Sequence, residues 1–185
     1  MKIGFTTRAA VAADAEAVCG VLRQTILESC VDDHRHDQAI LDAWLGNKHP
    51  AQVAAWMAAP ANYMVVAESV SGDADAAARV VGVALVNQAG KLALCHVLPQ
   101  AQRQGVGKAL LEAAEAKARG WGVAKVRIHG TVNSSGFYAR FGYLNAGKEK
   151  TCYGVDSDLL WKPLDAAAGV AASKRFCNCN PGNAQ

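Results

Sequence analysis

The segment Val97-Leu-Pro-Gln-Ala-Gln-Arg-Gln-Gly-Val-Gly-Lys108 joins the end of a predicted strand to the start of a predicted helix. Residues 92–98 are apolar and strand-like, and residues 109–119 repeat apolar side chains at helical spacing. Gly105 and Gly107 therefore lie at a helix N-terminus, where several backbone N–H groups lack an intrahelical acceptor. The helix dipole adds roughly half a positive charge there, so the segment favours binding of an anion.

The residues of this segment are suited to a phosphate. Gly105 and Gly107 carry no Cβ that would keep a pyrophosphate from the backbone donors, and Arg103 and Lys108 add positive charge. A Gly-x-Gly pair also occurs as an ordinary helix entry, so it does not define a site on its own. The chain has no Gly-x-Gly-x-x-Gly in an early βαβ unit and no Gly-x-x-x-x-Gly-Lys-Ser/Thr, which argues against a Rossmann site and a P-loop.

Two motifs together indicate a family. Gln102-x-x-Gly105-x-Gly107, after an apolar strand that ends at Val97-Leu98-Pro99, resembles the coenzyme A pyrophosphate signature of the GNAT superfamily of acyltransferases. Further along, Asn133, the pair Phe137-Tyr138 and the pair Gly142-Tyr143 resemble the second signature of that family. The two signatures occur in the family's order and spacing, and weaker similarity extends over residues 3–164.

The resemblance implies an α+β fold with a central, mostly antiparallel twisted sheet of about six to seven strands flanked by helices. Hydrophobic periodicity indicates the matching order βααα-βββ-α-β-α-ββ. We expect strands at residues 3–8, 63–69, 80–87, 91–98, 125–131, near 143 and at 159–162. We expect helices at 14–29 with Asp14 as N-cap, around 40–45, from 50 to 57, from the glycine loop to Gly120 or Gly122, and up to Phe141.

Length and composition predict one domain. A chain of 185 residues, 51% of them hydrophobic, can bury a sizeable core without metal or disulfide support. We expect a single domain at residues 1–164, followed by a flexible C-terminal tail at 165–185 that contains Cys177-Asn-Cys179. The net charge of +3 is mild, and no cluster of basic residues suggests a nucleic-acid partner.

The sequence also bears on location and redox state. No apolar run approaches the roughly 18 residues that cross a bilayer, and no signal core is visible, so we expect a cytoplasmic protein without a membrane partner. The six cysteines are then expected to be reduced thiols, with Cys19 and Cys95 in the core. Cys30 with His34 and His36 offers no fourth ligand at zinc-like spacing, so we expect a solvated loop and no metal. A homodimer is left open.

The activity that the resemblance implies is transfer of an acetyl group from acetyl-CoA to a primary amine by direct attack in a ternary complex. In this family the strands that carry Val97 and residues 126–131 splay apart around the pantetheine arm, which brings the Val97 N–H near the thioester carbonyl. The resemblance assigns a longer set of residues to the acetyl-CoA site: Val97, Leu98, Gln102, Arg103, Gln104, Gly105, Val106, Gly107, Lys108, Asn133, Tyr138 and Arg140.

Two of these residues have alternative interpretations. Tyr138 matches the family tyrosine that protonates the leaving thiolate as general acid, and a phenol with a pKa near about 10 is protonated at neutral pH. Alternatively, its ring packs with Phe137 and Phe141 against the sheet. Asn133 either bonds the pantetheine arm or caps the short helix after it. A non-catalytic coenzyme A-binding or regulatory domain remains the alternative to an enzyme.

The general base is not identified by the sequence. His96 is the titratable residue on the strand where the family places a base, but strict alternation puts it opposite Cys95 and Val97, a parity that a bulge would reverse. We favour a structural or supporting role for His96 over that of a base. Glu68, His129 and a water chain are weaker candidates.

The missing base bears on the acceptor. Neutralising a lysine-type amine at pH 7 costs about 4.6 kcal/mol, whereas an α-amine costs only about 1 to 1.4 kcal/mol. A weak base therefore suits a small amine or a peptide or protein N-terminus with a low pKa. Asp32 and Asp33, within the acidic segment 32–37, are candidates to attract this cation, with a solvated acidic turn as the alternative.

Overall fold

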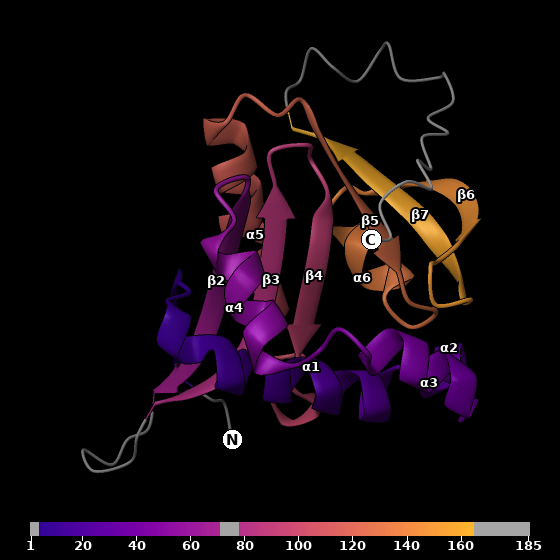
Figure 1. The fold of residues 1–185 in the computed structure, drawn as a ribbon. Coiled ribbons are helices and arrows are strands. Elements are labelled where there is room, and N and C mark those ends of the chain that lie inside the picture. Colours follow the sequence, from indigo (N-terminus) through magenta and orange to yellow (C-terminus); the bar gives the residue numbers. More distant parts are fainter. Residues whose placement is uncertain (1–3, 71–77, 165–185) are drawn as a thin grey trace.

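The computed structural model describes residues 4–70 and 78–164, and Figure 1 shows their arrangement. The strands are β1 (Gly4–Ala9), β2 (Asn62–Val70), β3 (Arg79–Asn87), β4 (Leu92–Val97), β5 (Lys125–Gly130), β6 (Leu144–Lys150) and β7 (Asp156–Pro163). The α-helices are α1 (Ala15–Ser29), α2 (Val31–His34), α3 (Gln38–Leu45), α4 (Pro50–Ala58), α5 (Val106–Gly120) and α6 (Ser135–Arg140). Short 3-10 turns, Ala12–Asp14 and Pro99–Ala101, precede α1 and α5. The expected α+β class is confirmed.

The strands of the described residues form two sheets rather than one central sheet. The first has the order β1-β2-β3-β4 and the second the order β5-β7-β6, and all neighbours within a sheet are antiparallel. β4 and β5 run parallel and meet in one isolated bridge, between Lys91 and Arg127. Beyond that bridge the two strands diverge, as Figure 1 shows, so the ladder stays open where the strands end.

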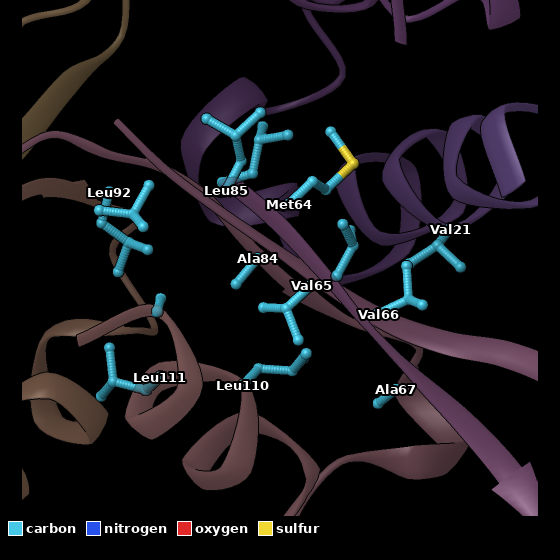
Figure 2. Close-up of a cluster of buried hydrophobic side chains, with 14 of the residues drawn as sticks. Val21, Met64, Val65, Val66, Ala67, Ala84, Leu85, Leu92, Leu110 and Leu111 are labelled. Carbon is cyan, nitrogen blue, oxygen red and sulfur yellow. The ribbon is translucent and has the colours of Figure 1, made fainter. Parts of the chain in front are cut away.

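Helices cover both faces of the first sheet. Because side chains alternate along a strand, neighbouring residues of β2 face different helices. Figure 2 shows Val65 directed toward Leu110 of α5 and Val66 toward Val21 of α1. All four side chains are at most 3% exposed. α5 approaches β3 closely at Gly82, where an added Cβ would lie 2.9 Å from the Leu110 side chain. This packing holds α5 firmly against the sheet.

Asp14 acts as predicted only in part. It occupies the N-cap position of α1, but its side chain makes no capping hydrogen bond to that helix. Its carboxylate instead accepts hydrogen bonds from Arg8 at 2.7 and 2.8 Å and from the Val11 backbone N–H at 2.8 Å. The hydrogen bonds from Arg8 lower the pKa of Asp14. The predicted N-cap position is therefore confirmed, but the side chain forms an ion pair with Arg8 of β1 instead of a capping hydrogen bond.

The segment after α1 also differs from expectation. We predicted a solvated turn, but residues 31–34 form α2, and Cys30, Asp33 and His34 are buried. Tertiary contacts override the acidic composition of this segment, as the site geometry below explains. Across residues 4–70 and 78–164 no group of three metal-binding side chains is present, and no helix is long and apolar enough to cross a membrane. The predicted tail, with Cys177 and Cys179, lies outside the described residues.

Candidate active site

The edge of β4 that is not paired with β3 lies on the side of β5. We call the space between these two diverging strands the gap. Gly82 and Val97 are paired, and the Leu98 N–H donates to the Val81 carbonyl at 2.9 Å. In an antiparallel ladder this makes Gly82–Val97 the pair without mutual hydrogen bonds, so the N–H and C=O of Val97 point away from β3. The Val97 carbonyl accepts a 3.1 Å bond from the Gln102 side chain on that side. The Val97 N–H is directed into the gap.

The turn into α5 provides a group of backbone donors at one end of this gap. Gly105 is the N-cap of α5 with φ +94°, and Arg103 has φ +58°. The left-handed backbone at these two nearby positions turns the chain sharply. Glycine adopts this conformation without strain because it has no Cβ. The first N–H that reaches back into the helix is that of Ala109, which donates to Gly105 O at 3.0 Å. The preceding N–H groups of α5 are thus the donors of a helix N-terminus.

Gly107 has a structural explanation besides the predicted one. A Cβ at this position would lie 3.3 Å from the Phe137 ring and 3.7 Å from the Val97 side chain. The missing side chain therefore allows α6 to pack closely against α5, in addition to the predicted role at the phosphate, which stays a prediction. Gly105 would meet nothing closer than Phe5 at 3.9 Å, so its positive φ explains this glycine.

The other residues assigned to the acetyl-CoA site have different exposures. Arg103 and Lys108 are exposed at the start of α5, and Lys108 lies 3.8 Å from Glu112. Leu98 and Val106 are buried, so their side chains belong to the core. Side-chain contacts hold two glutamines and an arginine: Gln102 also donates to Ser29 at 3.1 Å, Gln104 to Gln100 O at 2.8 Å, and Arg140 to Gly136 O at 3.1 Å.

Tyr138 lies on α6, the helix between β5 and β6. Its side chain is 3% exposed, and its ring contacts Phe137 and Tyr143 edge-on at centroid distances of 5.1 and 5.3 Å. The Cys95 thiol of β4 is among the groups that raise the pKa of its hydroxyl. Burial raises the pKa of Tyr138 well above its usual value, so the phenol keeps its proton at neutral pH. The tyrosine thus combines the packing role with a protonated hydroxyl at the gap.

His96 is not suited to accept a proton. β4 has a bulge at Ala93, where Leu94 and Leu92 pair with the adjacent residues Leu85 and Val86 of β3, but Cys95, His96 and Val97 still alternate. Burial, together with the charge of Lys48, lowers the pKa of His96 to about 4. A neutral imidazole with this pKa is a weak base at pH 7.

Lys48, which the sequence analysis missed, is a buried lysine near His96. It is 7% exposed, and its ammonium donates to Trp44 O at 3.1 Å and lies over the Trp56 ring at 5.6 Å. Burial lowers its pKa. Since a lysine in a polar loop is normally exposed, nothing in its sequence context signalled burial.

A second group of contacts joins α2 to the loop before α6. Asp33 accepts a 3.0 Å hydrogen bond from the Val132 N–H, and Asp32 accepts one of 2.7 Å from the Asn133 side chain. The N-cap of α6 is Ser134, so the predicted cap role of Asn133 is wrong. Asn133 instead forms a bridge across the molecule. These bonds explain why residues 31–34 fold onto the body.

A pocket lies at this junction. Its lining consists of Asp32, Asp33, Arg35, Ile40, Val132, Gly154, Val155 and Asp156. Asp33 is 7% exposed, and its second carboxylate oxygen is buried without a hydrogen-bond partner. Burial raises the pKa of Asp33. Three carboxylates against one guanidinium make the pocket acidic.

The remaining candidate bases are occupied elsewhere. Glu68 binds the Arg8 guanidinium on β1, at the other edge of the first sheet. His129 at the end of β5 bonds Glu149 of β6 at 2.9 Å. Neither residue is brought together with Tyr138 and Val97.

The fold agrees with the comparisons with known proteins. The family model "Acetyltransferase (GNAT) domain" matches residues 30–157, which is more than half of the chain. The chain therefore belongs to the GNAT acetyltransferase family, a class of acyltransferase enzymes. A candidate acetyltransferase of Bacillus subtilis (strain 168) is 31% identical over 85 residues, which span 46% of this chain and 58% of that protein.

Solved structures share the fold at low sequence identity. A GCN5-related N-acetyltransferase from Rhodopseudomonas palustris superposes with a TM-score of 0.73 at 19% identity, covering 88% of this chain and 98% of that one. The PaiA N-acetyltransferase from Thermoplasma acidophilum, solved with coenzyme A, has a TM-score of 0.69 at 15% identity over 86% and 99%. The yncA acetyltransferase from Salmonella typhimurium, solved with acetyl-CoA, has a TM-score of 0.64 at 19% identity over 88% and 95%.

Proposed function

We propose that this chain transfers the acetyl group of acetyl-CoA to a primary amine by direct attack in a ternary complex. The observation that carries the proposal is the unpaired edge of β4, where the Val97 N–H points away from β3. Two relatives of the same fold were solved with coenzyme A or acetyl-CoA, which supports this donor.

The α5 N-terminus is the proposed anchor for the donor. Its first N–H groups, its dipole and the exposed charges of Arg103 and Lys108 suit a pyrophosphate. With the phosphates at this end, the pantetheine arm runs along the open edge of β4. The thioester carbonyl then accepts a hydrogen bond from the Val97 N–H, which stabilises the oxyanion as the amine attacks.

The chemical step needs a neutral amine and a proton for the leaving group. The amine nitrogen forms a bond to the carbonyl carbon, the C–S bond breaks, and the coenzyme A thiolate takes the Tyr138 hydroxyl proton. The tyrosinate then regains a proton that the amine has released to solvent. A thiolate is unfavourable in this environment, since burial raises the pKa of the neighbouring Cys95 thiol to about 11. Protonation of the thiolate therefore removes a charge that the gap does not stabilise.

The acceptor that fits best is an amine of low pKa that arrives as a cation. Asp32, Asp33 and Asp156 attract an ammonium group to the pocket at α2. His96 has a pKa of about 4, and the Lys48 ammonium is a cation that donates hydrogen bonds, so neither residue is a strong base next to the gap. An α-amine of a small molecule or of a peptide N-terminus, which loses its proton to water readily, needs no strong base.

A thiol-release assay tests this proposal. The protein is incubated with acetyl-CoA and a panel of amines that contrasts α-amines with lysine-type amines, and free coenzyme A thiol is measured. We expect amine-dependent release, and acetyl-CoA at a hundred times its Kd should stabilise the folded state by about 2.7 kcal/mol. Stabilisation without thiol release across the panel would favour the non-catalytic coenzyme A-binding alternative. Absence of both would overturn the proposal.

A further inference from the structure

The pocket at α2 is joined to the ends of both strands that border the gap. Because β4 and β5 run parallel, their carboxyl ends point to the same edge of the molecule. The Gln102 side-chain amide donates to the Val97 carbonyl of β4 and to the Ser29 hydroxyl of α1, at 3.1 Å each. The helix α2 begins just after α1, and its Asp33 is bonded to the N–H of Val132, which follows β5. A cation in the pocket and an amine at the end of β4 can therefore belong to one small molecule.

Asp33 presents an unpaired acceptor at this pocket. One carboxylate oxygen accepts the bond from the Val132 N–H at 3.0 Å, whereas Oδ2 is buried without a hydrogen-bond partner among the residues that the structure describes. Asp33 lines the pocket and is 7% exposed. A buried acceptor without a donor costs free energy, so a donor from a bound molecule is favoured there. The donor that suits a carboxylate best is a cation, which forms a charge-assisted hydrogen bond.

The other lining residues suit a long basic side chain. Asp32 and Asp156 are exposed carboxylates, and the guanidinium of the exposed Arg35 is their counter-charge within the lining, so the pocket stays negative. The remaining lining residues are Ile40, Val132, Gly154 and Val155. Apolar residues of this kind pack against the methylene stem of a lysine- or arginine-type side chain, while its charged end contacts the carboxylates.

A nitrogen held by these carboxylates is not the nitrogen that attacks the thioester. The attacking amine must be neutral, whereas a negative charge beside an ammonium raises the pKa of that ammonium and keeps it protonated. The pocket and the end of β4 therefore require two different groups of the acceptor. Because an α-amine of low pKa suits a site without a strong base, the group for the pocket is a second one that stays cationic.

We propose that the acceptor is an α-amino compound with a basic side chain, whose cation binds in the pocket at α2 while its neutral α-amine attacks the thioester near Val97. The inference rests on the proposed acetyltransferase function and specifies its substrate class. The α-amine nitrogen forms the new amide bond and releases its proton to solvent, the C–S bond breaks, and coenzyme A leaves as the thiol. The side-chain cation is unchanged by the reaction.

Two matched acceptors test the inference by thiol release from acetyl-CoA. Argininamide and citrullinamide have the same length and the same α-amine, but the first side chain ends in a guanidinium and the second in an uncharged urea. A guanidinium stays protonated, so the α-amine is the nucleophile in both compounds. We expect kcat/KM to be about tenfold higher for argininamide, or about 1.4 kcal/mol, with the difference in KM rather than in kcat.

Equal kcat/KM values for the two compounds would overturn the inference and leave the proposed function intact. Release from another amine of the panel but from neither of these two would have the same meaning. Absence of release from every amine would overturn the inference together with the enzymatic function.

Three variants locate the preference in the pocket. Asp33→Asn retains an acceptor for the Val132 N–H and should abolish the preference, and Asp156→Asn, at an exposed position, should reduce it about threefold. Asp42→Asn removes the same charge from an exposed position of α3 outside the pocket and should keep the preference of the parent. If Asp33→Asn melts well below the parent, Asp156→Asn decides. A preference that survives both pocket variants, or falls equally in Asp42→Asn, would overturn the inference.

Discussion

The two sides of the gap are built in different ways. On the side of α5, the donors follow one another along the chain: Val97, the left-handed turn at Arg103 and Gly105, and the first turn of the helix lie within twelve residues. On the side of α2, contacts join residues that are 99 and 101 positions apart, Asp33 with Val132 and Asp32 with Asn133. The first side depends on backbone conformation, and the second depends on pairs of side chains.

The two sides are therefore expected to respond differently to substitutions. A backbone site at a helix N-terminus binds whatever carries the phosphate groups, and side-chain replacements nearby change it little. A site made by distant side chains changes with one substitution in either partner. We therefore expect the α5 side to set donor binding and the α2 side to set acceptor choice, with Tyr138 between them.

The largest expected effect is at Tyr138, where the two sides meet. Tyr138→Phe keeps the ring contacts and removes the hydroxyl, so kcat should fall roughly 10²-fold or more, while coenzyme A affinity changes little. The measurement is steady-state kinetics with calorimetry of coenzyme A binding. Full kcat with an unchanged alkaline limb would make solvent the proton donor.

Asp33→Asn tests the α2 side. The amide oxygen can still accept the bond from the Val132 N–H, but the negative charge of the pocket is reduced. We expect the KM of the amine to rise by about tenfold, because a partly buried charge pair contributes on the order of 1.4 kcal/mol to binding of the amine. The KM of acetyl-CoA should stay the same. An equal rise in both KM values would contradict the division between the two sides.

Lys108→Glu tests the α5 side against a control on the same helix. An exposed charge at a helix N-terminus contributes about 0.3–1 kcal/mol, so coenzyme A affinity should fall only about two- to fivefold, and more at low salt. Lys117→Glu makes the same charge change in the last turn of α5 and should leave affinity unchanged. Calorimetric titration at two ionic strengths compares them. Equal losses in both variants would mean that net charge, rather than the helix N-terminus, attracts the ligand.

The smallest effect is on stability as a function of pH. Burial raises the pKa of Asp33 in the folded chain above its unfolded value of about 3.9, so the folded state holds the proton more tightly. The unfolding free energy therefore falls as pH rises through the window above pH 4, until the folded carboxyl has ionised. Asp33→Asn lacks this loss, so its stability relative to the parent should increase from pH 4 to pH 7 in urea titrations. A difference that decreases over this range would show that the ionised carboxylate is stabilised in the fold.

The sequence predicted those parts that local physics determines. The turn at residues 97–108 and the strand–helix order follow from glycine positions and hydrophobic periodicity, and the structure has them, with α2 as an additional helix. The α+β class was implied by the family resemblance, and the structure confirms it. The ends of the strands differ by a few residues, as at β7, which begins at Asp156 rather than 159.

The parts that could not be predicted depend on contacts across the chain. Asp14 was expected to cap α1, but Arg8 attracts its carboxylate, and no local pattern reveals that β1 presents an arginine there. Residues 30–36 read as solvated because their composition is polar, yet the Val132 N–H gives Asp33 a buried partner. The buried Lys48 shows the same limit, since nothing in the sequence reveals that the Trp44 carbonyl accepts a hydrogen bond from its ammonium.

The bridge between Lys91 and Arg127 also bears on self-association of the chain. A strand that exposes unpaired N–H and C=O groups is a template for aggregation, and many proteins protect such edges with charges, prolines or bulges. Here the open half of β4 is turned inward, because the bridge anchors β5 beside it before the strands diverge. The second sheet and Tyr138 then stand where another chain would have to dock. We therefore expect the divergence of β4 and β5 to protect the unpaired groups of β4 from edge-to-edge pairing with other copies.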